Sequence, residues 1–275
     1  MTFIRKTLAL TVLSILLIAS STEGATLHTV LVGDSLDKQL GDGFSTSVTS
    51  MHKELAKVAN FAGMEFKSKI LLGRKTTISN VINALESLNV GENDTLFLYM
   101  TMHGYRTPSK DEISHWPNLF FGQERNGGDF SFFLNEALKK NPRLLIVYTD
   151  SCNSYFPENA VPTRMALQSL YVMHDDTLRI LNARRLFLES EGVILITSST
   201  PGQYSWGSQA IGGVMTQEFI KELNFGLTSH ELYSWDELLQ NIFIKMIQLY
   251  EEKYLPEEQT PIYEIYLACL SIMDR

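Results

Sequence analysis

Cysteine is scarce in this 275-residue chain, which contains only Cys152 and Cys269. At most one disulfide can therefore form, and a framework of several disulfides is excluded. Cys269 lies in the apolar run 265–270, where a buried free thiol is the expected state. Cys152 remains as the one cysteine with a role to explain.

The chain also lacks any cluster of basic residues. It has 23 Lys and Arg against 31 Asp and Glu, which gives a net charge of −8. Without a basic patch to meet phosphates, no nucleic-acid partner is expected. Internal repeats and low-complexity tracts are absent too, so one domain over residues 26–275 is the economical interpretation.

No hydrophobic run is long enough to span a bilayer comfortably. The apolar run 8–19 has 12 residues, comes after Arg5 and Lys6, and leads into the small, mostly polar residues 20–25. This pattern predicts a secretory signal peptide over residues 1–25, so we expect an exported protein, secreted or periplasmic. An uncleaved signal segment is the alternative and the only membrane attachment expected.

Short apolar runs alternate with segments of helical periodicity along the rest of the chain. The glycines at 41 and 43 are interpreted as a break, residues 126–128 as a hairpin turn and residues 155–177 as a long loop. Strands are expected at 27–33, 69–72, 94–103, 144–150, 192–197 and 262–272. Helices are expected at 48–61, 78–88, 132–140, 178–190, 213–223 and 234–249, with a cap at Thr76 or Thr77 and a capping box at 234–237. Such alternation predicts an α/β fold with one mostly parallel sheet covered on both faces.

Two of the predicted strands end in chemically useful residues. One run ends in His103-Gly104 and another in Asp150-Ser-Cys152. If the two strands are neighbours, His103 and Cys152 emerge at the carboxyl edge of the sheet, where open α/β sheets bind ligands. The spacing of 49 residues between them is that of a caspase-type histidine and cysteine.

Four blocks resemble the caspase and metacaspase clan of cysteine peptidases. They are Asn93-Asp94 with His103-Gly104, residues 150–154, residues 200–206, and Gln259-Thr-Pro261 before the last strand. They occur in the clan's order and together cover roughly residues 27–272. The resemblance implies a three-layer fold around a mostly parallel sheet of about six strands. The chain departs from the metacaspase pattern at Met100-Thr-Met102, Asn153 and Tyr155, which could alter the shape of the site.

The resemblance also implies a mechanism. Cys152 would be the nucleophile, His103 the base, and the backbone N–H groups of Gly104 and Cys152 the oxyanion hole. The substrate would be a polypeptide, with no cofactor or metal in the chemistry. Activation by calcium stays open, although no EF-hand spacing is present.

The resemblance suggests which residues face the substrate. Caspases hold an acidic P1 residue with arginines, one of them directly after Ser-Trp, but Gly207 stands at that position here. Asp34 and Asp150 look like the other two pocket positions, so Lys or Arg at P1 is expected. Asp34 is equally interpretable as a turn cap. Ser205 and Trp206 would line the edge that pairs with an extended substrate.

Two other functions compete with this one. Val32-Gly-Asp-Ser-Leu36 and Gly91-Glu-Asn-Asp94 resemble blocks of GDSL-type esterases, with Ser35 as nucleophile. The late Asp-x-x-His of those enzymes is absent, and a serine without a base is a poor nucleophile. A catalytically inactive caspase-like binding protein, a pseudopeptidase, is the non-enzymatic alternative.

Overall fold

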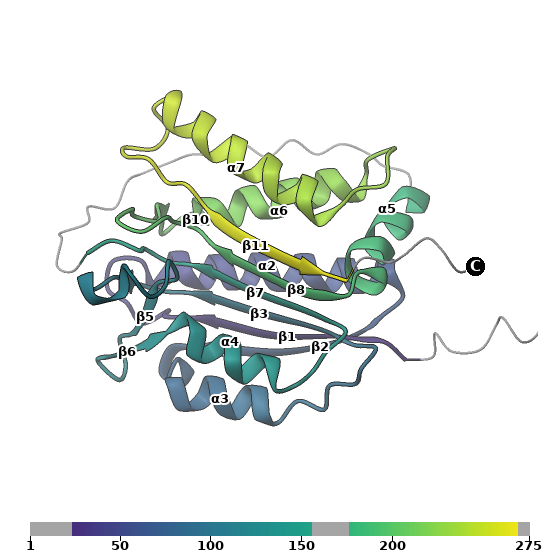
Figure 1. The fold of residues 1–275 in the computed structure, drawn as a ribbon, viewed down its shortest axis with the longest axis horizontal. Coiled ribbons are helices and arrows are strands. Elements are labelled where there is room, and N and C mark those ends of the chain that lie inside the picture. The colour runs from purple at the N-terminus through teal and green to yellow at the C-terminus, as the bar shows by residue number, and fades with distance from the viewer. Residues whose placement is uncertain (1–23, 156–175, 269–275) are drawn as a thin grey trace, which may run out of the picture.

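A mostly parallel sheet of six strands forms the middle of three layers (Figure 1). The computed structural model describes residues 24–155 and 176–268. The strand order is β11-β8-β7-β3-β1-β2, in which β11 alone runs antiparallel to its neighbour. The strands are β1 (Thr26–Gly33), β2 (Glu65–Leu72), β3 (Thr95–Thr101), β7 (Leu144–Asp150), β8 (Gly192–Thr197) and β11 (Ile262–Leu267). The predicted fold class is confirmed.

Helices cover both faces of this sheet. Four pack on one face and contribute to one hydrophobic core; they are α2 (Gly41–Ala62), α5 (Asp176–Ala183), α6 (Val214–Leu227) and α7 (Trp235–Glu251). The other face carries α3 (Ile78–Glu86) and α4 (Phe130–Leu138), which enclose a second core. Every residue of β1, β3 and β7 is buried, which explains why their sequences are mostly apolar.

Short elements complete the described chain. A small sheet holds β4 (Gly104–Tyr105), β5 (Asn118–Phe121) and β6 (Asn126–Asp129), and a two-stranded one holds β9 (Gly207–Ser208) and β10 (Gly212–Gly213). Single turns of helix are η1 (Gly73–Lys75) and η2 (Pro108–Lys110), and η3 (Arg184–Glu189) is a π-helix.

The expected break at Gly41–Gly43 is wrong, because these residues form the first turn of α2. Side chains there would collide with neighbouring backbone: a Cβ on Gly41 would meet the carbonyl of Ser35, and one on Gly43 the carbonyl of Ser208. The glycines therefore serve close packing rather than chain reversal.

The expected hairpin exists, but its turn lies elsewhere. Asn126–Gly128 belong to strand β6, and the chain reverses at 122–125, where Arg125 adopts a φ of 50°. The helix expected at 178–190 is also two elements, α5 and η3. The carbonyl of Phe187 in η3 accepts hydrogen bonds from Thr95 and Arg143. Such donors from outside the helix suit a π-helical turn.

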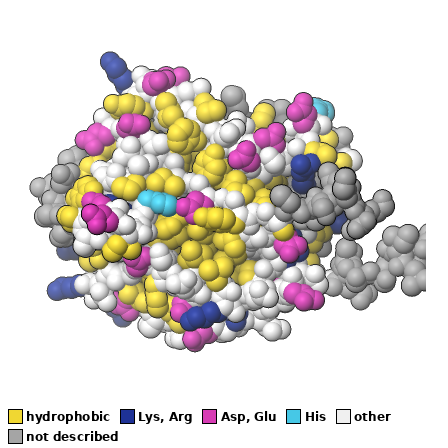
Figure 2. Space-filling model, viewed as in Figure 1, with side chains coloured by type: hydrophobic (Ala, Val, Ile, Leu, Met, Phe, Trp, Pro, Cys, Tyr) yellow, Lys and Arg dark blue, Asp and Glu magenta, His cyan; other side chains and the backbone are white. Residues whose placement is uncertain are grey.

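The helix caps at Thr77 and Ser234 are confirmed, the latter as a complete capping box. Most of the loop expected at 155–177, Cys269 and most of the expected signal peptide lie outside the described residues. Among the described helices, none combines the length and apolarity needed to cross a membrane. On the face seen in Figure 2, Lys and Arg side chains are scattered among hydrophobic and acidic ones.

Candidate active site

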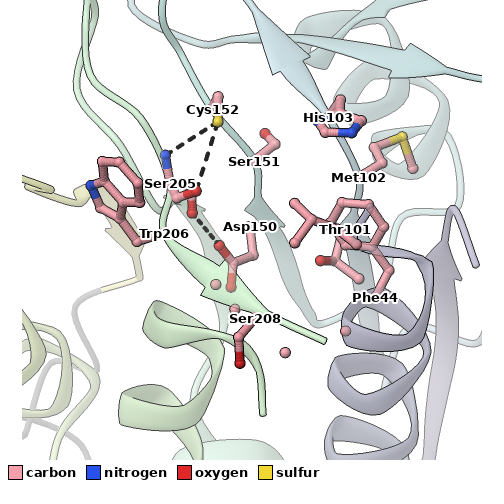
Figure 3. Close-up of a pocket in the computed structure, with 15 residues that line it drawn as sticks. Phe44, Thr101, Met102, His103, Asp150, Ser151, Cys152, Ser205, Trp206 and Ser208 are labelled. Atoms are coloured by element: carbon pink, nitrogen blue, oxygen red, sulfur yellow. Dashed lines mark hydrogen bonds between the residues drawn. The ribbon is translucent and has the colours of Figure 1, made fainter. Parts of the chain in front are cut away.

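His103 and Cys152 emerge beside each other because their strands are neighbours in register. Thr101, the last residue of β3, pairs with Asp150, the last residue of β7. Two residues beyond this pair, His103 and Cys152 line one pocket at the carboxyl edge of the sheet (Figure 3). The pocket predicted from the two strand tips is therefore formed.

The thiol of Cys152 lies against the backbone of Ser205. The Ser205 N–H donates to Sγ over 3.3 Å, and the Ser205 carbonyl oxygen lies 3.7 Å from Sγ. Burial and the carboxylate of Asp150 raise the pKa of Cys152 to about 11, against the lowering effect of the Ser205 N–H. The resting thiol is thus mainly protonated at neutral pH and needs a base to become a nucleophile.

His103 is held from two sides. Its Nε2 lies 3.2 Å from Oδ2 of Asp37, and Phe44 of α2 presents an edge-to-face contact with ring centroids 5.7 Å apart. The imidazole keeps a relative side-chain exposure of 36%, so solvent and a bound peptide can reach it. Asp37 was not singled out in the sequence.

The backbone N–H of Gly104 does not pair with β5. Phe120 N donates to His103 O over 2.8 Å, so Gly104, opposite Leu119, occupies a non-hydrogen-bonded position of the β4–β5 ladder. Its N–H points away from β5, to the same side as the N–H of Arg106, which donates to Ser154. That side is where the chain after Cys152 runs. Any side chain at 104 would collide with the carbonyl oxygen of Cys152.

Asp150 is the acidic residue of the pocket lining. It is 3% exposed, and its carboxylate accepts hydrogen bonds from the hydroxyl of Ser205, over 2.6 Å, and from the backbone and hydroxyl of Thr216. Burial raises the pKa of Asp150, and the hydrogen bonds offset part of that effect. No lysine or arginine is among the described residues that line the pocket.

Ser205 and Trp206 form the wall beside the thiol. The Ser205 hydroxyl receives hydrogen bonds from Ser198, over 2.9 Å, and from Gln259, over 3.1 Å. Gln259 is fully buried, and its Oε1 accepts from the backbone N–H of Trp206 over 2.9 Å. The Gln-Thr-Pro block noticed in the sequence thus fixes the main chain of this wall.

Asp34 lies outside the pocket lining. It is 2% exposed, packs against the backbone of Gly122, and has a pKa raised by burial and by neighbouring Asp37. Ser35 is also outside the lining, and its hydroxyl accepts a hydrogen bond from Gly73 N over 2.8 Å. The structure therefore brings together Gly104, Asp150, Ser205 and Trp206 with His103 and Cys152 and leaves Ser35 apart. Asp34 does not line the pocket, but its carboxyl lies close enough to Asp37 and His103 for their charges to act on its pKa.

The residue after the cysteine braces the site. Asn153 is fully buried, and its Nδ2 donates to the carbonyls of His115, over 2.8 Å, and Ser199, over 3.2 Å. Its Oδ1 accepts from the buried guanidinium of Arg106 over 3.5 Å. The departure from the metacaspase sequence at this position therefore has a bracing role in this chain. Within residues 24–155 and 176–268, no group of three or more His, Cys, Asp or Glu is arranged to hold a metal ion.

The fold and the strand-tip pair of histidine and cysteine define the class of a caspase-like α/β protein. The family model for the caspase domain matches residues 42–265, so the chain belongs to the caspase-domain family of cysteine peptidases. No curated protein matches the sequence.

Two solved structures share the fold at low identity. One is protein GSU0716 from Geobacter sulfurreducens, with 17% identity, a TM-score of 0.52, and coverage of 88% of this chain and 93% of that one. The other is caspase-1 from Spodoptera frugiperda, with 12% identity, a TM-score of 0.51, and coverage of 89% of each chain.

Proposed function

We propose that the protein is a cysteine endopeptidase in which Cys152 attacks the peptide bond and His103 is the base. The observation that carries this proposal is the convergence of both side chains on one pocket at paired strand ends. Membership of the caspase-domain family supports the same chemistry. We further propose that the protein is exported and acts on polypeptides outside the cytoplasm, as its N-terminal residues suggest.

The proposed reaction passes through a thioester. His103 accepts the Cys152 proton as Sγ attacks the carbonyl carbon, and the N–H groups of Gly104 and Cys152 stabilise the resulting oxyanion. The C–N bond then breaks, and the imidazolium gives its proton to the leaving amine. A water molecule, deprotonated by His103, attacks the thioester and releases the second product and the thiol.

The charge of the pocket favours a basic P1 residue. Asp150 places a carboxyl group beside Cys152, and no cationic side chain in the described lining is positioned to pair with an acidic P1 group. A guanidinium or ammonium near the carboxylate would favour its ionised form and gain a charge-assisted hydrogen bond. Lys and Arg are therefore the proposed P1 residues, with Asp150 as their partner.

A fluorogenic peptide panel tests both parts of the proposal. Substrates with Arg, Lys, Asp and Asn at P1, assayed with and without calcium, should be cleaved in the order Arg or Lys far above Asn and Asp. The expected preference for Arg over Asp in kcat/KM is about 100-fold or more, since a hydrogen bond to a charged group contributes about 1.5–3 kcal/mol and an acidic P1 adds repulsion. Preferential cleavage after Asp would contradict the assignment of Asp150. The calcium arm decides whether the ion activates the protein.

One set of observations favours a second candidate, a caspase-like protein that binds peptides without cutting them. The space inside this open pocket is about 30 Å³, room for a water molecule, so an arginine side chain would fit only after the pocket walls move apart. The thiol has a pKa of about 11 and already has the Ser205 N–H against it. Peptide binding without turnover across the whole panel would select this candidate.

A further inference from the structure

Asp37 is the charged side chain that contacts the candidate base, and its two carboxylate oxygens have different partners. Oδ1 accepts hydrogen bonds from the backbone N–H groups of Gln39, over 2.9 Å, and Leu40, over 2.7 Å. Oδ2 lies 3.2 Å from Nε2 of His103. One oxygen thus anchors the carboxylate to the turn before α2, while the other faces the imidazole.

This anchoring gives the carboxylate a fixed direction and keeps it ionised. Burial acts to raise the pKa of Asp37, but the N–H groups of Leu40 and Gln39 and the adjacent His103 outweigh it and hold the pKa below its ordinary value. Asp37 is 21% exposed at its side chain, so its interaction with His103 is partly shielded from water. Phe44, three residues after the helix begins, limits rotation of the same ring.

We propose that Asp37 is a positioning residue that holds the neutral His103 ring as the Nε2–H tautomer, leaving the Nδ1 lone pair as the proton acceptor. A neutral imidazole has one N–H and one lone pair, and the hydrogen bond at one nitrogen selects the role of the other. An anionic oxygen accepts only, so Nε2 must carry the proton in this pair. The same contact stabilises the imidazolium formed after His103 takes the thiol proton. The inference rests on the proposed function for its catalytic meaning, but the tautomer itself does not depend on turnover.

The simpler role for Asp37 is as a cap of the turn that leads into α2. Asparagine separates the two roles, because asparagine caps such N–H groups about as well as aspartate does. In Asp37→Asn the single amide oxygen is expected to keep the two backbone N–H groups, which places the NH₂ group toward His103. An NH₂ group only donates, so Nε2 must then become the acceptor and the proton moves to Nδ1. Asp37→Ala loses the cap as well as the contact.

The test combines NMR with kinetics on the full chain. Histidine ring ¹⁵N chemical shifts, recorded at alkaline pH and assigned with His103→Ala, should report the Nε2–H tautomer in the unaltered protein and the Nδ1–H tautomer in Asp37→Asn. The kcat of Asp37→Asn should fall about 10- to 100-fold with KM and melting temperature nearly unchanged, a smaller loss than complete removal of a general base. Asp42→Asn replaces an exposed acid in the first turn of α2 and is the matched control. It should change neither the tautomer of His103 nor kcat.

The outcomes separate this inference from the proposed function. An unchanged tautomer and an unchanged kcat in Asp37→Asn, or an Nδ1–H tautomer in the unaltered protein, would overturn the positioning role. Absence of turnover in the unaltered protein would overturn the peptidase, while the expected tautomer switch would still support the role of Asp37 in setting His103. If Asp37→Asn lowers the melting temperature as much as Asp37→Ala does and leaves the tautomer unchanged, Asp37 acts only as a cap.

Discussion

Replacing Cys152 by alanine is expected to lower kcat/KM for a peptide with arginine at P1 by about 10⁴-fold or more, because no other thiol is among the described residues that line the pocket. His103→Ala should cause a loss of at least about 10²-fold, because the thiol, with a pKa of about 11, depends on a base at neutral pH. The double variant should lose little more than Cys152→Ala alone, since residues that act as a unit are not additive. Initial rates of fluorogenic cleavage measure all three variants.

The second cysteine of the chain provides the matched control. Cys269→Ala removes the other thiol and should retain full activity, which separates the chemistry of Cys152 from a general effect of losing a cysteine. Hydrolysis that survives in Cys152→Ala would instead point to another nucleophile, such as the Ser35 of the competing esterase interpretation. An equal loss of activity in Cys269→Ala would mean that the loss in Cys152→Ala is not specific to the proposed nucleophile.

Replacing Asp150 by asparagine is expected to lower the selectivity for arginine over neutral norleucine at P1 by about 10- to 100-fold. The variant removes the negative charge but keeps one acceptor oxygen, and hydrogen bonds to charged groups contribute about 1.5–3 kcal/mol. The ratio of the two kcat/KM values is the measurement, because damage to the shared catalytic groups cancels from a ratio. Retained selectivity in Asp150→Asn would contradict the assignment of this carboxylate to P1.

Thr216→Val supplies the matched control for the hydrogen-bond network. It removes a hydroxyl that donates to Asp150 but keeps the carboxyl itself. The loss of this hydrogen bond raises the pKa of Asp150 further, so the control is read at a pH where the carboxyl is still ionised, and any loss of stability should then come without loss of arginine selectivity. The selectivity for arginine at P1 should also depend on pH, in a direction set by Asp150. Because burial raises the pKa of Asp150, its carboxyl becomes neutral at a higher pH than an ordinary aspartate on acidification. Selectivity for arginine should therefore decline on acidification and recover when the carboxyl ionises, and Asp150→Asn should lack this dependence.

The central strands could be predicted from the sequence because their environment is uniform. A strand buried on both faces is mostly apolar, so β1, β3 and β7 stand out as hydrophobic runs, although β1 also contains the buried polar residues His28 and Thr29. The shared location of His103 and Cys152 was predictable for the same reason, since neighbouring parallel strands that end together place their next residues at one edge of the sheet. The start of α2 was not predicted, because Gly41 and Gly43 are required by close contacts with the backbone of Ser35 and Ser208. No local sequence pattern reveals such contacts.

The supporting residues of the site were harder to predict, because their partners are distant in sequence. Asp37 contacts a histidine 66 positions further along the chain, and Asn153 joins three segments that only the fold brings together. Each is a polar residue in a loop, and such residues carry no periodic signal. Gln259 was noticed as part of a motif, but its hydrogen bonds to the wall of the pocket require the fold.

Covalent labelling tests the central claim most directly. The full chain is incubated with a peptidyl acyloxymethyl ketone that carries arginine at P1, and the adduct is mapped by mass spectrometry after digestion. We predict a single adduct on Sγ of Cys152, with carboxylate as the leaving group, reduced strongly in His103→Ala and absent from Cys152→Ala. An unlabelled Cys152 in a chain that still binds the peptide, or an adduct on any other residue, would contradict the proposed peptidase.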